Sequence, residues 1–240
     1  MNSLHDASKP YVAIFLDIDG VLGPAKELTE DESKKKKEII KKLVQDPYHA
    51  FGCKRCNSCS SAEAFLFKTE VLEPFHNLIE KISEVANVHI VISSTWRTGR
   101  SVDDLKAIFH MHKFSKHIID KTIDSKISFH EWQGHCTFPH LEISDENCML
   151  ENNLDRWPTP KELEAFIYKH WECRASEINR WIKLHPEYVA FTILDDLDEH
   201  LSINFGNKFI STLHPEGAIL KPEDTKKAYQ VIMNQLGYSS

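Results

Sequence analysis

Three largely apolar runs stand out along the chain, at residues 12–16, 88–93 and 189–194. A run without regular polar alternation is typical of a strand that is buried on both faces, as in a parallel sheet. A fourth and weaker run covers residues 208–212. Each of the first three runs ends in a small or acidic cluster: Asp17-Ile-Asp-Gly20, Ser93-Ser-Thr95 and Asp195-Asp196.

Between these runs, apolar residues recur at the spacing of an amphipathic α-helix. Ser101 and the pair Thr159-Pro160 are suited to the start of a helix, as an N-cap and as an N-cap followed by proline. The pattern predicts helices at residues 30–45, 72–85, 101–109, 161–170, 176–184 and 222–236. Strands that alternate with helices favour an α/β fold with a parallel sheet and right-handed crossovers.

Residues 46–68 and 126–158 fit that alternation poorly, because the first stretch is loop-like and rich in cysteine and the second is irregular. We interpret them as insertions on one domain. The prediction is a single domain over residues 1–240, with small insertions at about 24–68 and 126–158 rather than a full second domain.

Composition narrows the class of protein. Of the 240 residues, 41% are hydrophobic and 27% are charged, which is typical of a folded protein that works in water. The net charge of −7 disfavours extensive wrapping by nucleic acid, although a local basic patch such as Lys34–Lys37 leaves a nucleic-acid partner open. We expect no membrane span, since no stretch approaches the ~20 apolar residues that one needs. We also expect no signal peptide.

Six cysteines, three of them at Cys53, Cys56 and Cys59, do not resemble a secreted disulfide framework. Reduced thiols in a cytoplasmic, reducing compartment are the favoured interpretation. The alternative is a structural Zn²⁺ held by Cys53, Cys56 and Cys59, because their spacing is typical of metal ligands.

The chemistry of the chain is indicated by Asp17 and Asp19, two positions apart directly after a predicted strand. One carboxylate is suited to attack phosphorus, and the other to protonate the leaving oxygen and then activate water. The alternative is two solvated aspartates at the end of a strand. Asp195 and Asp196 end another buried run, and four carboxylates brought together would repel one another unless a cation lay among them. Mg²⁺ prefers such oxygen ligands.

Hydroxyl and basic side chains complete the candidate site. Ser93 ends the second run and can donate to a phosphate oxygen, a role that Ser94 or Thr95 could share. Serines in this position also commonly cap the next helix. Arg174, just before the predicted helix at 176–184, is a candidate for holding the phosphate, and Lys169 is an alternative for the same role.

These residues resemble the motifs of the haloacid dehalogenase superfamily. The segment 15–22 is similar to its first motif, 91–93 to its second, Arg174 to its third and 193–196 to its acidic fourth motif. Segments 93–97, 174–178 with Trp181, and 193–196 also resemble a compact subgroup that occurs in bacterial RNA-repair proteins and in phosphatases of bacterial effector type.

The resemblance implies a role for each residue. Asp17 would be the nucleophile and Asp19 the general acid and base. Mg²⁺ would be held by the Asp17 carboxylate, the Asp19 backbone carbonyl and Asp196, with Asp195 in support. Aspartate at position 19 favours a phosphatase over a dehalogenase.

Three functions follow as hypotheses. The first is a phosphomonoesterase on a macromolecule, with protein phosphotyrosine favoured by the likeness to effector-type enzymes. That likeness also raises delivery into a host cell as a hypothesis. The second is an end-processing phosphatase for RNA or DNA, and the third is a catalytically idle binding module. The oligomeric state is not predicted.

Overall fold

The computed structural model describes residues 6–23, 67–97, 100–122, 173–197 and 200–238, with isolated positions at Asp31, Lys34, Lys35 and Ala64. The predicted helix at 161–170, Lys169, the cysteines at 53, 56 and 59, the insertion at 126–158 and most of the insertion at 24–68 lie outside these residues. Of the predicted helix at 30–45, the three described residues are helical.

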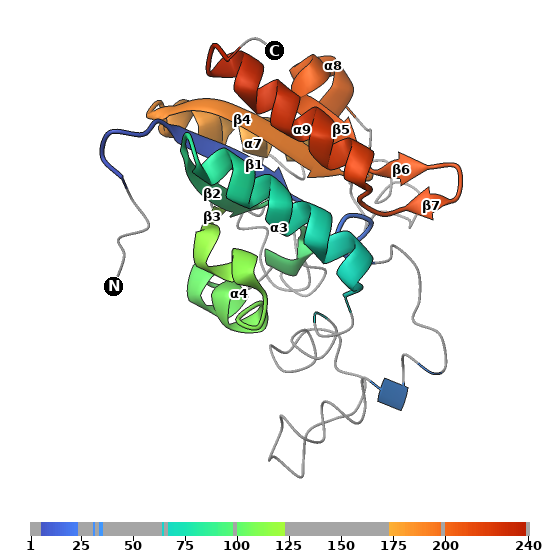
Figure 1. Cartoon of the computed structure of the whole chain (residues 1–240). Coiled ribbons are helices and arrows are strands. Elements are labelled where there is room, and N and C mark those ends of the chain that lie inside the picture. Colours follow the sequence, from blue (N-terminus) through green and yellow to red (C-terminus); the bar gives the residue numbers. More distant parts are fainter. Residues whose placement is uncertain are drawn as a thin grey trace, which may run out of the picture.

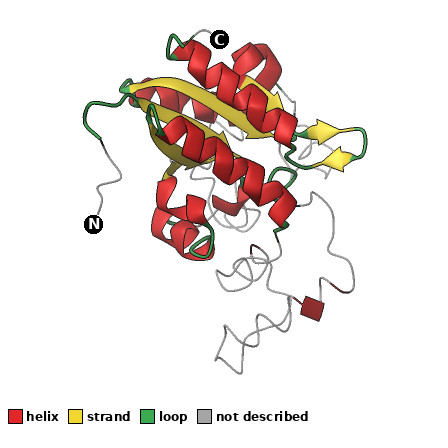
Figure 2. Ribbon diagram, in the orientation of Figure 1, coloured by secondary structure: helices red, strands yellow, loops and turns green. Residues whose placement is uncertain are grey.

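The described part of the chain forms a five-stranded parallel sheet with the strand order β3-β2-β1-β4-β5. The strands are β1 (Tyr11–Leu16), β2 (Asn87–Ile92), β3 (Ile118–Lys121), β4 (Tyr188–Asp195) and β5 (Phe209–Ser211). Figure 1 shows the helices in layers on both sides of this sheet, and Figure 2 separates helix from strand by colour. The predicted α/β fold with a parallel sheet is confirmed.

Helices cover both faces of the sheet. One face carries α3 (Thr69–Ser83), α4 (Val102–Ile108) and α9 (Pro222–Gln235), and the other carries α7 (Cys173–Leu184) and the short α8 (Leu201–Phe205). Figure 1 shows α3 and α9 lying next to each other across the first face. The shorter elements are the 3₁₀ turns η1 (Thr95–Arg97), η2 (Lys113–His117) and η4 (Gly206–Lys208), and a hairpin of β6 (Leu213–His214) and β7 (Gly217–Ala218).

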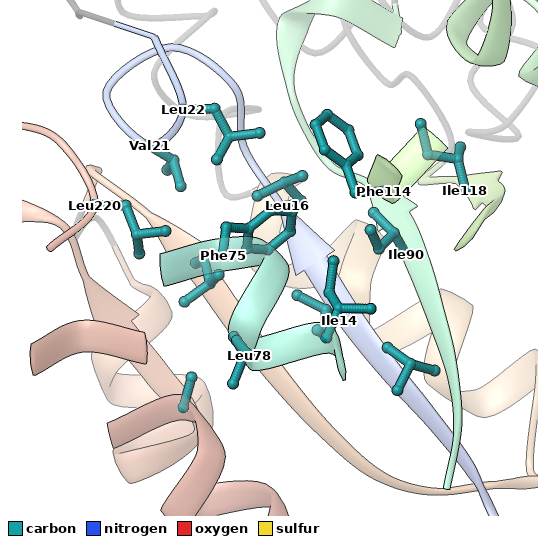
Figure 3. Packing of buried hydrophobic residues seen from close by; sticks show 14 of the residues in the cluster. Ile14, Leu16, Val21, Leu22, Phe75, Leu78, Ile90, Phe114, Ile118 and Leu220 are labelled. Carbon is teal, nitrogen blue, oxygen red and sulfur yellow. The ribbon is translucent and has the colours of Figure 1, made fainter. Parts of the chain in front are cut away.

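The alternation along β1 explains this layering. Ile14 and Leu16 are fully buried against the α3 face, where Figure 3 shows them with Phe75 of α3 and Ile90 of β2. Phe15 points to the opposite face and meets Trp181 of α7 edge to face, with ring centroids 5.3 Å apart. Because helices cover both faces of the sheet, the sequence of β1 is a continuous apolar run.

The strand order places the carboxyl ends of β1 and β4 at a topological switch point. The chain runs from β1 outward to β3 on one side and from β4 outward to β5 on the other. In such sheets, ligands bind beyond the carboxyl ends of the strands near this switch. The ladder continues one step past the strands, since Asp17 N–H donates to Leu194 O at 3.0 Å and Ser93 N–H donates to Leu16 O at 2.9 Å.

No helix among the described residues is long and apolar enough to cross a membrane.

Candidate active site

Asp17 begins a tight loop that follows β1. The residue is 4% exposed, and its Oδ1 accepts a hydrogen bond from Ile18 N–H at 2.9 Å. The Ile18 carbonyl accepts from the N–H groups of Leu22 and Gly23, both at 3.0 Å, which closes the loop on itself. The loop therefore holds Asp17 at the edge of the sheet with one carboxylate oxygen already oriented.

Gly20 allows this loop to lie in close contact with the side chain of Asp196. Its φ of +78° is a conformation that other residues resist, and a Cβ there would lie 2.3 Å from Asp196 Cγ. Thr212, just after β5, donates from Oγ1 to Gly20 O at 2.8 Å. Three strand ends, those of β1, β4 and β5, are thereby tied together.

Asp17, Asp195 and Asp196 form an acidic cluster in which one carboxylate oxygen from each residue lies within 4.8 Å of the others. Asp195 is fully buried, and its Oδ1 accepts from Leu197 N–H at 2.9 Å. Burial, and then the charge of Asp17, raise the pKa of Asp195, and the same two causes raise the pKa of Asp196. The cluster is therefore a place where negative charge is crowded and poorly hydrated.

Arg174 partly offsets this charge. Its Nη1 donates to Asp17 Oδ2 at 3.1 Å and also contacts Asp195 Oδ2. Burial by itself would lower the pKa of Arg174, but the carboxylates of Asp195 and Asp17 raise it above its ordinary value.

The sequence prediction that Arg174 precedes the helix is wrong, because α7 begins at Cys173 and Arg174 lies in its first turn.

The acidic cluster has the donor set of a divalent metal site. Three carboxylates and one guanidinium leave a formal charge of −2 in a largely buried space, which a divalent cation would neutralise. Gly20 lets the loop approach Asp196 closely enough to keep the oxygens together. The residues present therefore fit a metal ion, held by Asp17, Asp195 and Asp196.

Ser93 and Ser94 directly follow β2, next to the end of β1, and both are buried. Among the described residues, Ser93 Oγ has no hydrogen-bond partner. A buried hydroxyl without a partner costs free energy, and a bound ligand oxygen would supply the missing acceptor. Ser94 Oγ accepts a weak bond from Trp96 N–H at 3.4 Å. Of the two serines, Ser93 is the better candidate for holding a phosphate.

Asp19 lies on the exposed side of the loop, in contrast to the buried Asp17. Its Oδ2 accepts a hydrogen bond from Trp96 Nε1 at 3.0 Å. Trp96 therefore combines a packed ring with a contact to a candidate site residue.

Sequence reasoning missed the ion pair of Arg97 and Glu177. Arg97 Nη2 lies 2.6 Å from Glu177 Oε2, and the two side chains are 2% and 6% exposed. Arg97 also donates from Nη1 to Ser94 O at 2.7 Å. A buried arginine needs a carboxylate partner, but nothing in the sequence indicates which of the many acidic residues supplies it.

One of the comparisons with known proteins finds a match. Residues 13–217, most of the chain, match the family described as the HAD domain in Swiss Army Knife RNA repair proteins. No curated protein and no solved structure matches the chain.

Proposed function

The chain belongs to the family of HAD domains found in Swiss Army Knife RNA repair proteins, which supports a phosphatase-type hydrolase, and we propose that it is a Mg²⁺-dependent phosphomonoester hydrolase. The observation that carries the proposal is the acidic cluster of Asp17, Asp195 and Asp196, with Arg174 bridging two of its members. Phosphoryl transfer depends mainly on positioning and on charge stabilisation, and this cluster with its arginine supplies both.

In the proposed reaction, an oxygen of Asp17 attacks phosphorus while the bond to the leaving oxygen breaks. Asp19 gives its proton to that oxygen, and an aspartyl-phosphate forms on Asp17. Asp19 then removes a proton from water, which attacks phosphorus and regenerates the Asp17 carboxylate. Ser93 and Arg174 hold the non-bridging oxygens. Mg²⁺ bound by the acidic cluster, together with the Asp19 carbonyl, would neutralise charge between the nucleophile and the phosphate.

The first test is hydrolysis of p-nitrophenyl phosphate with and without Mg²⁺, for the wild type and Asp17→Asn. We expect Mg²⁺-dependent turnover that the substitution abolishes, since an amide cannot act as the nucleophile. Asp103→Asn, an exposed aspartate in the first turn of α4, is the matched control and should keep full activity. Turnover that survives in Asp17→Asn would contradict the mechanism. An inactive wild type would favour the idle binding module.

For the substrate we propose a phosphorylated protein, with phosphotyrosine as the favoured group. The support is the general resemblance of the chain to effector-type phosphatases, together with the net charge of −7, which disfavours a polyanionic substrate. A reducing, cytoplasmic setting, in the producing cell or in a host, is part of the same proposal.

A second candidate is an end phosphatase for RNA or DNA, and the family match favours it. The two candidates separate in a salt titration on phosphopeptides and on 3′- and 5′-phosphorylated oligonucleotides. Recognition of a nucleic-acid backbone falls steeply with salt, whereas peptide turnover is much less sensitive. Higher kcat/KM on oligonucleotides at low salt, with a steep decline, would overturn the phosphoprotein assignment.

A further inference from the structure

We propose that Trp96 is a positioning residue that holds the carboxyl group of Asp19 where it must deliver its proton. The inference rests on the proposed function, because it assigns a role within that reaction. It goes beyond the family match, which says nothing of individual contacts.

The indole of Trp96 is itself held rigidly. It lies in η1, directly after the strand end that carries Ser93 and Ser94, and it is 7% exposed. Its ring stacks on Phe109, with ring centroids 5.5 Å apart and an angle of 21° between the planes. The centroid of the Phe67 ring lies 6.0 Å from that of Trp96. The N–H that points to Asp19 is therefore fixed in direction before any substrate arrives.

Asp19 differs from Asp17 in its exposure. Asp17 is buried, whereas Asp19 lies on the exposed side of the loop. An exposed carboxyl group samples several rotamers, and fixing it costs conformational entropy. A hydrogen bond at 3.0 Å from a ring that is already immobile restricts these rotamers at little further cost.

A purely structural explanation must be separated from this one. A largely buried indole N–H generally finds an acceptor, so the contact could serve Trp96 rather than Asp19. The two explanations predict different losses of kcat/KM for different substrates when the N–H is removed. Proton donation by Asp19 matters most when the departing oxygen is strongly basic, and least when the leaving group departs as a stable anion.

The experiment compares kcat/KM for phenyl phosphate, a poor leaving group, and 2,4-dinitrophenyl phosphate, a good one. For Trp96→Phe we expect a loss of roughly 10- to 100-fold on phenyl phosphate, as for a displaced catalytic group. On the dinitrophenyl ester we expect a loss of less than about threefold, because little proton transfer is needed. Asp19→Asn should show the same selectivity with a larger loss.

Phe109→Leu loosens the packing that holds the indole and keeps the N–H, so it should show the selectivity of Trp96→Phe with a smaller loss on phenyl phosphate. The exposed control Asp103→Asn should leave both rates unchanged. Should Trp96→Phe fold poorly, β-(3-benzothienyl)alanine at position 96 replaces the N–H with sulfur in a ring of nearly the same shape. Equal losses on both esters, or no loss, in the folded variant would overturn the positioning role. A wild type inactive on both esters would instead overturn the proposed function, and this inference with it.

Discussion

At the scale of single residues, the site depends on how closely the loop after β1 approaches the end of β4. Gly20 lies against Asp196 in a conformation with φ of +78°, and the three atoms nearest to an added Cβ all belong to the Asp196 side chain. A side chain at position 20 would therefore strain the backbone and also push Asp196 away from Asp17. The first effect lowers stability, and the second separates the oxygens of the acidic cluster.

Gly20→Ala should consequently lose more activity than its stability loss explains. We expect a fall in Mg²⁺-dependent turnover of at least about 100-fold, because misplacement by roughly 1 Å has that effect on catalysis. The backbone strain should cost about 1–2 kcal/mol in the free energy of unfolding. Gly237→Ala is the control, since Gly237 has a similar φ of +82° and nothing within 4 Å of an added Cβ. Equal activity in the two variants would show that Gly20 serves only the backbone.

Apart from Arg174, which lies in α7, the site residues that the sequence predicted lie at or soon after the end of a buried run. Asp17, Ser93 and Asp195 could be placed together because parallel strands end at one edge of a sheet. The partners of Trp96 and Arg97 could not be predicted. Their contacts, to Asp19 and to Glu177, join positions 77 and 80 residues apart, and they depend on how the loop and α7 pack on the sheet.

At the scale of elements, the pair of Arg97 and Glu177 links η1 to α7. Glu177 lies one turn after Arg174 on the same helix, and Arg97 follows Ser93 and Ser94 along the chain. The ion pair thus connects the turn that directly follows the candidate phosphate hydroxyls with the helix that carries the candidate phosphate arginine. Removing one partner leaves the other charge buried without compensation.

Arg97→Met should lower the free energy of unfolding by about 3–5 kcal/mol, measured by urea denaturation. The double variant Arg97→Met/Glu177→Leu should recover most of this stability, because no unpaired charge remains. The exposed pair of Lys113 and Glu80, 3.7 Å apart, is the control, and Lys113→Met should change stability by less than about 1 kcal/mol. A double variant as unstable as Arg97→Met would contradict this account.

The elements that the sequence predicted well are those that bury long apolar stretches. The apolar runs that form β1, β2 and β4 are such stretches, and α3 and α9 each have a regular apolar face. The sequence did not predict β3, α8 or the hairpin of β6 and β7. β3 has four residues, of which only the first is fully buried, and α8 has five. Elements this short have no period to recognise, and tertiary contacts decide their conformation.

At the scale of the whole molecule, the fold brings carboxylates together at one edge of the sheet against their mutual repulsion. Burial and the charge of Asp17 raise the pKa of Asp196, so the folded metal-free protein binds a proton there more tightly than the unfolded chain does. The stability that this protonation contributes is present in acid and is lost as the pH rises through the raised pKa. The same holds for Asp195. The fold therefore stores electrostatic strain that a bound cation would relieve.

Asp196→Asn should raise the stability of the metal-free protein and reduce the stabilisation that Mg²⁺ provides. Without metal at pH 8, the variant should melt at a higher temperature than the wild type, because the amide mimics the protonated acid. With Mg²⁺ at 100 times its dissociation constant, the wild type should gain about 2.7 kcal/mol. That gain corresponds to a rise in Tm of about 5–10 °C for a chain of this size. The variant should gain much less, since it lacks one ligand, and the exposed control Asp103→Asn should respond to Mg²⁺ as the wild type does. A wild type whose Tm is unchanged by Mg²⁺, or a metal-free variant less stable than the wild type, would mean that these carboxylates are not held together for a cation.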